Sequence, residues 1–152
     1  MDPALYVSTS GYVGIGTTTP EANLDVSGTI RHTGILIDAS DRRLKSNIRQ
    51  LPTSLEAMMK LNPVSFTMND NPAQTEYGFI AQDVQPLFPT LVVTGNDPSK
   101  TLSLNYPGFI APMVKAMQEL KADNDNVRRE LNDLRKELRD LKSGDGKRIE
   151  AR

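Results

Sequence analysis

The most regular hydrophobic pattern in the chain lies between about residue 108 and residue 142. Two series of positions there repeat every seven residues and alternate by three and four without a break. The first series is Ile110, Met117, Asn124, Leu131 and Leu138, and the second is Met113, Leu120, Val127, Leu134 and Leu141. Together they form a heptad seam, which predicts one long helix in a coiled coil.

A strict repeat over this length favours association between chains over a helix that packs only on its own domain. Charged residues fill flanking positions, among them Arg128, Glu130, Arg135 and Glu137. Asn124 is the polar exception in the seam, and such residues usually fix register and strand number at a cost in stability. Because leucine is frequent in both series, the sequence does not choose between a dimer and a trimer.

The middle of the chain alternates between strand-like and helix-like patterns, which predicts a small mixed module. Pro52 lies ahead of the first helical pattern, and Asn62-Pro63 ends it. The predicted elements are, in chain order, a helix at 54–61, a strand at 64–68, a polar loop at 69–75, a strand at 77–81, a short helix at 82–87, and strands at 91–94 and 101–106.

The first part of the chain, residues 1–39, is punctuated by glycines and predicts short β-strands. The alternating runs 12–15 and 24–27 and the apolar run 34–37 have the length of strands of four or five residues. Such strands bury little alone, so we expect them to need neighbours from other copies of the chain. Gly14-Ile15-Gly16 is no dinucleotide fingerprint, because the third glycine and the following helix are absent.

Composition narrows the classes of function. The 152 residues carry 18 basic and 19 acidic side chains, a net charge of −1 that gives no indication of nucleic acid or an acidic membrane surface as a partner. Cysteine is absent, which excludes disulfides and thiolate metal sites, and the single histidine, His32, excludes a multi-histidine metal site. No apolar run approaches the ~20 residues of a membrane helix, and the amino terminus lacks a signal-peptide pattern. We expect no cofactor and no metal.

Candidate chemistry lies where the β-rich part of the chain gives way to the mixed module, at Ala39 and Ser40. A serine hydroxyl is a weak nucleophile until a base takes its proton. His32 is the only histidine that could be this base, and Lys45, five residues after Ser40, is the other candidate, since serine–lysine pairs are an established variant.

A lysine base has to be neutral near pH 7, although the reference pKa of lysine is about 10.4. Burial or nearby cations lower a lysine pKa. Arg42 and Arg43 supply positive charge, and we expect the folded module to supply the burial. From the residues alone, Ser40, Asp41 and Lys45 could equally form a helix cap or a solvated turn.

Ser40–Ile48 resembles the opening signature of the intramolecular chaperone auto-processing family. This is the C-terminal serine peptidase domain of phage tailspikes, tail fibres and endosialidases, and it is also found in a eukaryotic membrane-bound transcription factor. The resemblance continues in the family's order through Tyr77–Val84, Phe88–Val92 and Leu102–Tyr106 into the long helix, over about residues 40–141. Residues 11–30 resemble the short β segments that precede this domain in fibre proteins.

The resemblance implies an intramolecular chaperone that forms a homotrimer and aligns an upstream passenger fibre in cis. It then cuts itself between Ala39 and Ser40, with Ser40 as nucleophile and Lys45 as base. Asp41 and Gln82 are candidate supporting residues. The resemblance also places the passenger in a phage virion, as a tail fibre or tailspike, and the released chaperone in the host cytoplasm during assembly. A host receptor would be contacted only through the passenger.

Together these observations predict an α+β chain in an intertwined homotrimer. We expect four segments: the end of a β-rich fibre passenger at 1–39, the auto-processing module at 40–106, the coiled-coil trimerisation helix at 107–142, and a flexible tail at 143–152. One alternative is a structural trimerisation cap that is never cut. Another is a receptor-binding fibre tip, for which the sequence offers no aromatic-rich pocket.

Overall fold

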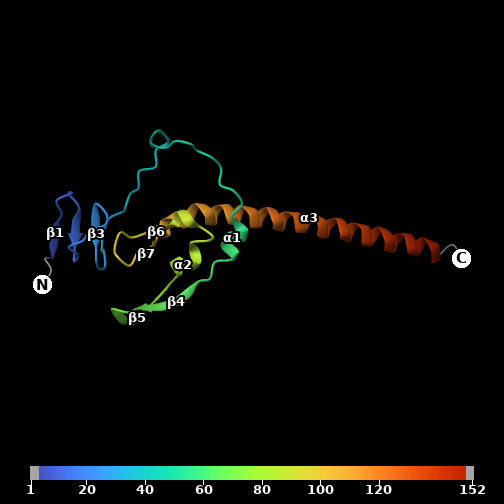
Figure 1. Ribbon diagram of the computed structural model, residues 1–152. Coiled ribbons are helices and arrows are strands. Elements are labelled where there is room, and N and C mark those ends of the chain that lie inside the picture. Colours follow the sequence, from blue (N-terminus) through green and yellow to red (C-terminus); the bar gives the residue numbers. More distant parts are fainter. Residues whose placement is uncertain (1–3, 150–152) are drawn as a thin grey trace. The chain divides into compact units, whose positions relative to one another are not determined.

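The computed structural model describes residues 4–149 and the side chains of residues 4–142. The chain is α+β, with small sheets and a long carboxyl-terminal helix (Figure 1). Its residues divide into two compact units. The first comprises Met1–Arg49 with Thr94–Ser103, and the second comprises Gln50–Val93 with Leu104–Arg152. The predicted division into passenger and chaperone at Ser40 concerns function and stays a prediction.

The first unit contains a three-stranded sheet of very short strands. Strand β2 (Val13–Ile15) lies in the middle, antiparallel to β1 (Leu5–Val7) and parallel to β3 (Leu24–Val26). The strands predicted at 12–15 and 24–27 are therefore confirmed, whereas β1 was not predicted. Gly16 has a φ of 70° directly after β2, a conformation that glycine adopts without steric cost.

The apolar run predicted as a strand at 34–37 forms none. Ile35, Leu36 and Ile37 are 83%, 84% and 76% exposed. A strand exists only when a neighbour accepts and donates its backbone hydrogen bonds. Within a single chain this run pairs with no strand, so the pattern of side chains alone did not determine its structure.

A hairpin of β6 (Val92–Thr94) and β7 (Leu102–Leu104) confirms the strands predicted near these positions. The Asp97 carboxylate organises the loop between them. It accepts hydrogen bonds from the backbone N–H groups of Ser99 and Thr101 and from the Thr101 hydroxyl. These bonds, the Thr101 N–H first, lower the pKa of Asp97 below its ordinary value.

The second unit contains a small aromatic core around the start of the long helix. The elements of the second unit are α1 (Leu55–Met59), β4 (Val64–Met68), β5 (Asn71–Gly78), α2 (Ala81–Val84), a 3₁₀ turn at Pro89–Leu91, a second 3₁₀ turn at Tyr106–Phe109, and α3 (Ile110–Ile149). The centre of the aromatic core is formed by three buried residues, Val84, Leu91 and Phe109. The Phe109 ring stacks on Phe79 and meets Phe88 edge to face.

Residues 69–75, predicted as a polar loop, belong mostly to a strand. β5 (Asn71–Gly78) pairs antiparallel with β4, with Val64 opposite Gly78 and Thr67 opposite Thr75. The predicted strand at 77–81 therefore ends early, at Gly78, and α2 begins at Ala81. The polarity of these residues was misleading because most of β5 is exposed, so no alternation of apolar side chains marks it as a strand.

A long-range contact attaches α1 to α3. One Glu119 carboxylate oxygen accepts the backbone N–H groups of Ser54 and Leu55, at 3.0 and 2.9 Å, at the amino end of α1. The Glu119 side chain is only 18% exposed, and Lys115 lies 3.4 Å from its second oxygen. The Leu55 N–H is the main cause of the lowered pKa of Glu119. A carboxylate of α3 thus satisfies amides that a five-residue helix cannot satisfy itself.

Gly78 provides a test of this packing. The Phe79 N–H donates to the Tyr106 hydroxyl at 3.1 Å, and that oxygen occupies the place of a Cβ added at Gly78. We expect Gly78→Ala to lower the free energy of unfolding by about 1–3 kcal/mol, because Tyr106 has to move and its hydrogen bond is lost. Urea denaturation followed by circular dichroism measures this. Gly34→Ala is the control, since no atom lies within 4 Å of its added Cβ; equal stability of both variants would contradict the prediction.

The long helix predicted from about residue 108 is confirmed as α3, with a 3₁₀ turn directly before it. The helix runs to Ile149, beyond the predicted end at residue 142, because each further residue adds one hydrogen bond once a helix is formed. The tail predicted at 143–152 lies partly in this helix, and residues 150–152 lie outside the described part of the chain. All apolar residues of the heptad seam are exposed in the single chain, between 45% and 71%.

Candidate functional site

A single turn of 3₁₀ helix lies between Ser40 and Lys45. It comprises Arg42–Leu44, and its backbone bonds run from the Leu44 N–H to the Asp41 carbonyl and from the Lys45 N–H to the Arg42 carbonyl, both 3.1 Å. Five residues of extended chain would separate the ends by roughly 16 Å. The turn shortens this path to a distance that a lysine side chain can span.

The predicted pair of site residues meets across this turn. Lys45 Nζ donates a hydrogen bond to Ser40 Oγ at 2.5 Å. Nucleophile and base have to be within hydrogen-bond reach for proton transfer, and this distance satisfies that requirement. A neutral amine at the same position could accept the hydroxyl proton along the same line.

Asp41 caps the turn and binds Arg43 at the same time. Its Oδ1 accepts the Arg43 backbone N–H at 2.8 Å. The Arg43 guanidinium donates from Nε to both carboxylate oxygens at 3.1 Å and from Nη2 to Oδ2 at 2.7 Å. The guanidinium first, and the backbone N–H second, hold the pKa of Asp41 below its ordinary value, while Asp41 raises the pKa of Arg43.

The charges around the pair differ from the sequence-based expectation. Both Arg42 and Arg43 were expected to supply positive charge near Lys45. Asp41 compensates the charge of Arg43, whereas Arg42 forms no ion pair within residues 4–142. Only Arg42 therefore offers an uncompensated positive charge within this turn.

Ser40 and Lys45 are both exposed in the single chain. The burial expected to favour a neutral lysine is thus not provided by the turn itself. Two residues further on, Asn47 has a φ of 54°, a left-handed conformation that asparagine tolerates better than most residues. The chain then runs without regular structure to α1.

The other candidate residues lie elsewhere. His32 is exposed, and its Nδ1 lies 3.0 Å from the Gly34 carbonyl oxygen, so this ring is engaged locally. Gln82 is exposed on α2 in the second unit. A supporting role for Gln82 stays a prediction, as do the catalytic roles of Ser40 and Lys45.

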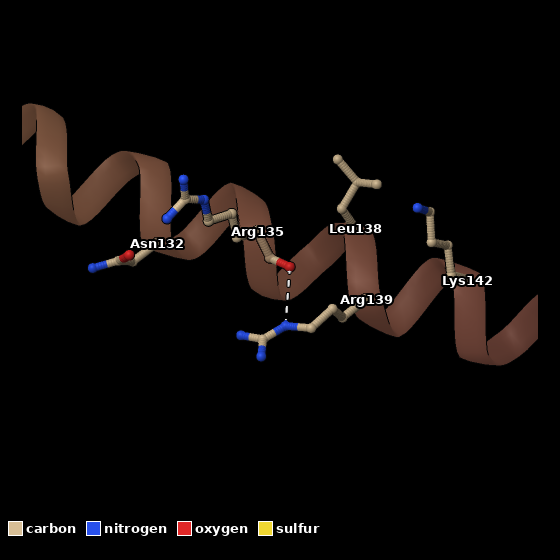
Figure 2. A pocket seen from close by; sticks show the side chains of 5 residues that line it. All are labelled: Asn132, Arg135, Leu138, Arg139 and Lys142. Atoms are coloured by element: carbon tan, nitrogen blue, oxygen red, sulfur yellow. Dashed lines mark hydrogen bonds between the residues drawn. The ribbon is translucent and has the colours of Figure 1, made fainter.

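One hollow lies along α3. It has a volume of about 640 Å³, and Figure 2 shows the residues that line it: Asn132, Arg135, Leu138, Arg139 and Lys142. Arg139 Nε donates to the Arg135 carbonyl at 3.3 Å, while Leu138 points to another side of the helix. Because one helix provides the whole lining, the hollow is an open surface beside the heptad seam and not an enclosed ligand site.

Other kinds of site find no support in the described residues. Within the part of the chain that the structure covers, no group of three or more His, Cys, Asp or Glu side chains could hold a metal ion. No helix among the same residues combines the length and the apolar character needed to cross a membrane.

Comparison with known proteins shows a family match in the middle of the chain. Residues 40–93 match the family described as chaperone of endosialidase, and the match begins at Ser40. This segment belongs to the chaperone of endosialidase family. The family also carries a peptidase name, which indicates a serine-peptidase-like, self-cleaving domain. The resemblance found in the sequence is thereby confirmed.

Two relatives extend the comparison. The long tail fiber protein Gp37 of Salmonella phage S16 is 30% identical over 113 residues, which are 68% of this chain and 14% of that protein. An uncharacterized membrane protein of Dictyostelium discoideum is 34% identical over 110 residues, which are 60% of this chain and 6% of that protein. The chain thus spans a small share of either relative. The family and the fibre relative support a chaperone role.

Proposed function

We propose that this chain is an intramolecular chaperone that assembles a passenger fibre as a homotrimer and then cuts itself off between Ala39 and Ser40. The observation that carries this proposal is the 2.5 Å contact of Lys45 Nζ with Ser40 Oγ at the first residue of the family match. A serine–lysine contact five residues apart has no evident structural purpose in an exposed turn that Asp41 already caps.

The chemistry follows from the position of Ser40 directly after the scissile bond. Neutral Lys45 takes the hydroxyl proton while Oγ attacks the carbonyl carbon of Ala39. The carbon–nitrogen bond then breaks, the Ser40 nitrogen takes the proton from Lys45, and Ala39 is left as an ester on Oγ. Water hydrolyses the ester, which gives an Ala39 carboxylate and restores the Ser40 hydroxyl. Backbone amides of the folded module are the proposed donors to the developing oxyanion.

Assembly can supply what the single chain lacks at this site. Neighbouring chains that cover the turn would bury the Lys45 amine, and burial favours the neutral form of a lysine in general. Self-cleavage would then follow assembly and would not precede it. Release of the chaperone thereby reports that the passenger chains have been brought together.

The heptad seam on α3 supports association between chains. Its apolar residues are exposed along one stripe, a surface that monomeric proteins rarely leave open. Residues on the two sides of the seam are matched in charge at a spacing of five: Asp123 with Arg128, Glu130 with Arg135, and Glu137 with Lys142. Such pairs connect neighbouring helices when these run parallel and in register. Antiparallel helices would set acidic residues against acidic ones.

The passenger is proposed to be a phage tail fibre or tailspike, by analogy with the fibre relative. Intertwined β-fibres have pairings between chains that form slowly and risk wrong registers. A parallel coiled coil forms from local contacts and sets the register first. The finished fibre, held by its unfolding barrier, would no longer need the guide. On this proposal the fibre belongs to the virion, and the released chaperone stays in the host cytoplasm.

Mass spectrometry of the folded wild-type chain tests the proposal. We expect two products, one ending with Ala39 and one beginning with Ser40, and the second product should be trimeric by sedimentation equilibrium. Only an intact chain, after prolonged incubation of an assembled sample, would contradict self-cleavage. That result would favour the alternative of a structural cap that stays attached, for which the exposed seam is the supporting observation.

A further inference from the structure

We propose that Arg43 is a positioning residue for self-cleavage. The hydrogen bonds of its guanidinium to both oxygens of the Asp41 carboxylate, called the fork below, fix the turn that brings Lys45 to Ser40. The inference rests on the proposed chemistry of Ser40 and Lys45. It differs from the sequence-based expectation, in which Arg43 acts only as a nearby positive charge.

The hydrogen bonds of Asp41 show how one arginine can hold the turn. Its carboxylate accepts the Arg43 backbone N–H, which caps the turn, and the guanidinium of the same residue. Without the guanidinium, the carboxylate could rotate away from the backbone N–H and leave the cap. The fork fixes the carboxylate in one orientation and thereby keeps the turn closed.

The exposure of Arg43 and Asp41 indicates that their ion pair positions the turn and contributes little to the stability of the whole domain. The Arg43 side chain is 88% exposed and that of Asp41 is 43% exposed, so the ion pair fills no core. Exposed ion pairs contribute little to the unfolding of a whole domain. Their effect on the conformation of a short turn is local. A change at Arg43 should therefore alter the geometry of the Ser40–Lys45 pair while leaving assembly and unfolding as they were.

Lysine cannot replace this arginine, because the planar guanidinium matches both carboxylate oxygens and an ammonium does not. Arg42 is a matched control in the same turn. It carries the same side chain one residue earlier and forms no ion pair within residues 4–142. Arg43→Lys and Arg42→Lys both keep the positive charge, so they isolate the geometry of the fork from its charge.

The test is the rate of self-cleavage of the assembled chain, measured across a pH series for wild type, Arg43→Lys and Arg42→Lys. We expect Arg43→Lys to lower the maximal rate about two- to fivefold, the range expected from loss of an exposed ion pair. The midpoint of its pH profile, its oligomeric state and its unfolding should match wild type. Arg42→Lys should match wild type throughout. In an Asp41→Asn background, Arg43→Lys should have no further effect, because the fork is already lost.

Equal rates for Arg43→Lys and Arg42→Lys would overturn the assignment of Arg43. So would a shift in the pH midpoint of Arg43→Lys with its maximal rate retained, since that result indicates an electrostatic role. Failure of wild type to cleave would instead contradict the proposed function, so the two failures can be told apart.

Discussion

Ser40→Ala and Lys45→Met are each expected to abolish self-cleavage and to leave the assembled chain intact. The first removes the nucleophile and the second removes the base 2.5 Å from it. Loss of a positioned general base typically costs roughly 10²–10⁴-fold in rate, and loss of the attacking oxygen removes the route altogether. A time course by mass spectrometry should show the products for wild type and only the full-length chain for both variants.

Ser46→Ala is the matched control, because Ser46 directly follows Lys45 and is also exposed. It should cleave like wild type. Ser40→Cys separates chemistry from structure, since a thiol can attack the same carbonyl although its hydrogen bond is weak. Cleavage retained in Ser40→Cys and lost in Ser40→Ala supports a nucleophile. A product beginning at residue 40 in the Ser40→Ala variant would overturn the assignment.

The long helix could be predicted from the sequence because its signal is local and repeated. The spacing of apolar residues along the chain defines every heptad position of α3. In the structure these residues form an exposed stripe, as the spacing predicts. The end of the helix was less certain, since Ser143 and the glycines after it favour termination and yet the helix continues to Ile149. Helix boundaries depend on small differences in propensity.

Features that depend on distant partners could not be predicted. Glu119 accepts two backbone N–H groups at the start of α1, more than sixty residues earlier in the chain, and neither segment carries a signal for the other. The strand β5 was missed because most of it is exposed and its sequence has no alternation of apolar side chains. Conversely, the run Ile35–Ile37 has the composition of a strand but no partner within one chain. The hydrophobic pattern of a segment does not say which other segment, if any, pairs with it.

At the candidate site, the residue types were predictable and the bonds between them were not. The motif indicated Ser40 and Lys45, which the structure brings into contact. The fork of Arg43 on Asp41 was missed, although two opposite charges two residues apart in a predicted turn were a usable signal. In the amino-acid sequence, Arg42 and Arg43 look equivalent. Only the direction of the Asp41 carboxylate distinguishes Arg43, which is paired with it, from Arg42, which is not.

Leu134→Lys is expected to convert the assembled chain to a monomer and to suppress self-cleavage with it. Leu134 lies in the heptad seam and is 59% exposed in the single chain, so its burial depends on neighbouring helices. Each chain would lose about 2–5 kcal/mol of apolar burial, and several ammonium groups would meet at one layer of the coiled coil. Sedimentation equilibrium measures the loss of assembly, and mass spectrometry measures the loss of the products.

Asn132→Lys adds the same charge two residues earlier, outside the seam, and should leave both assembly and cleavage as in wild type.

The pair of variants also tests whether self-cleavage depends on assembly. In the single chain Lys45 already contacts Ser40 and is exposed. On the proposed mechanism, assembly would therefore bury the amine and would not have to bring the two groups together. If monomeric Leu134→Lys cleaves at the wild-type rate at neutral pH, one chain suffices and the proposed order of assembly before cleavage is wrong. If it is monomeric and uncut while Asn132→Lys is assembled and cut, release of the chaperone follows assembly.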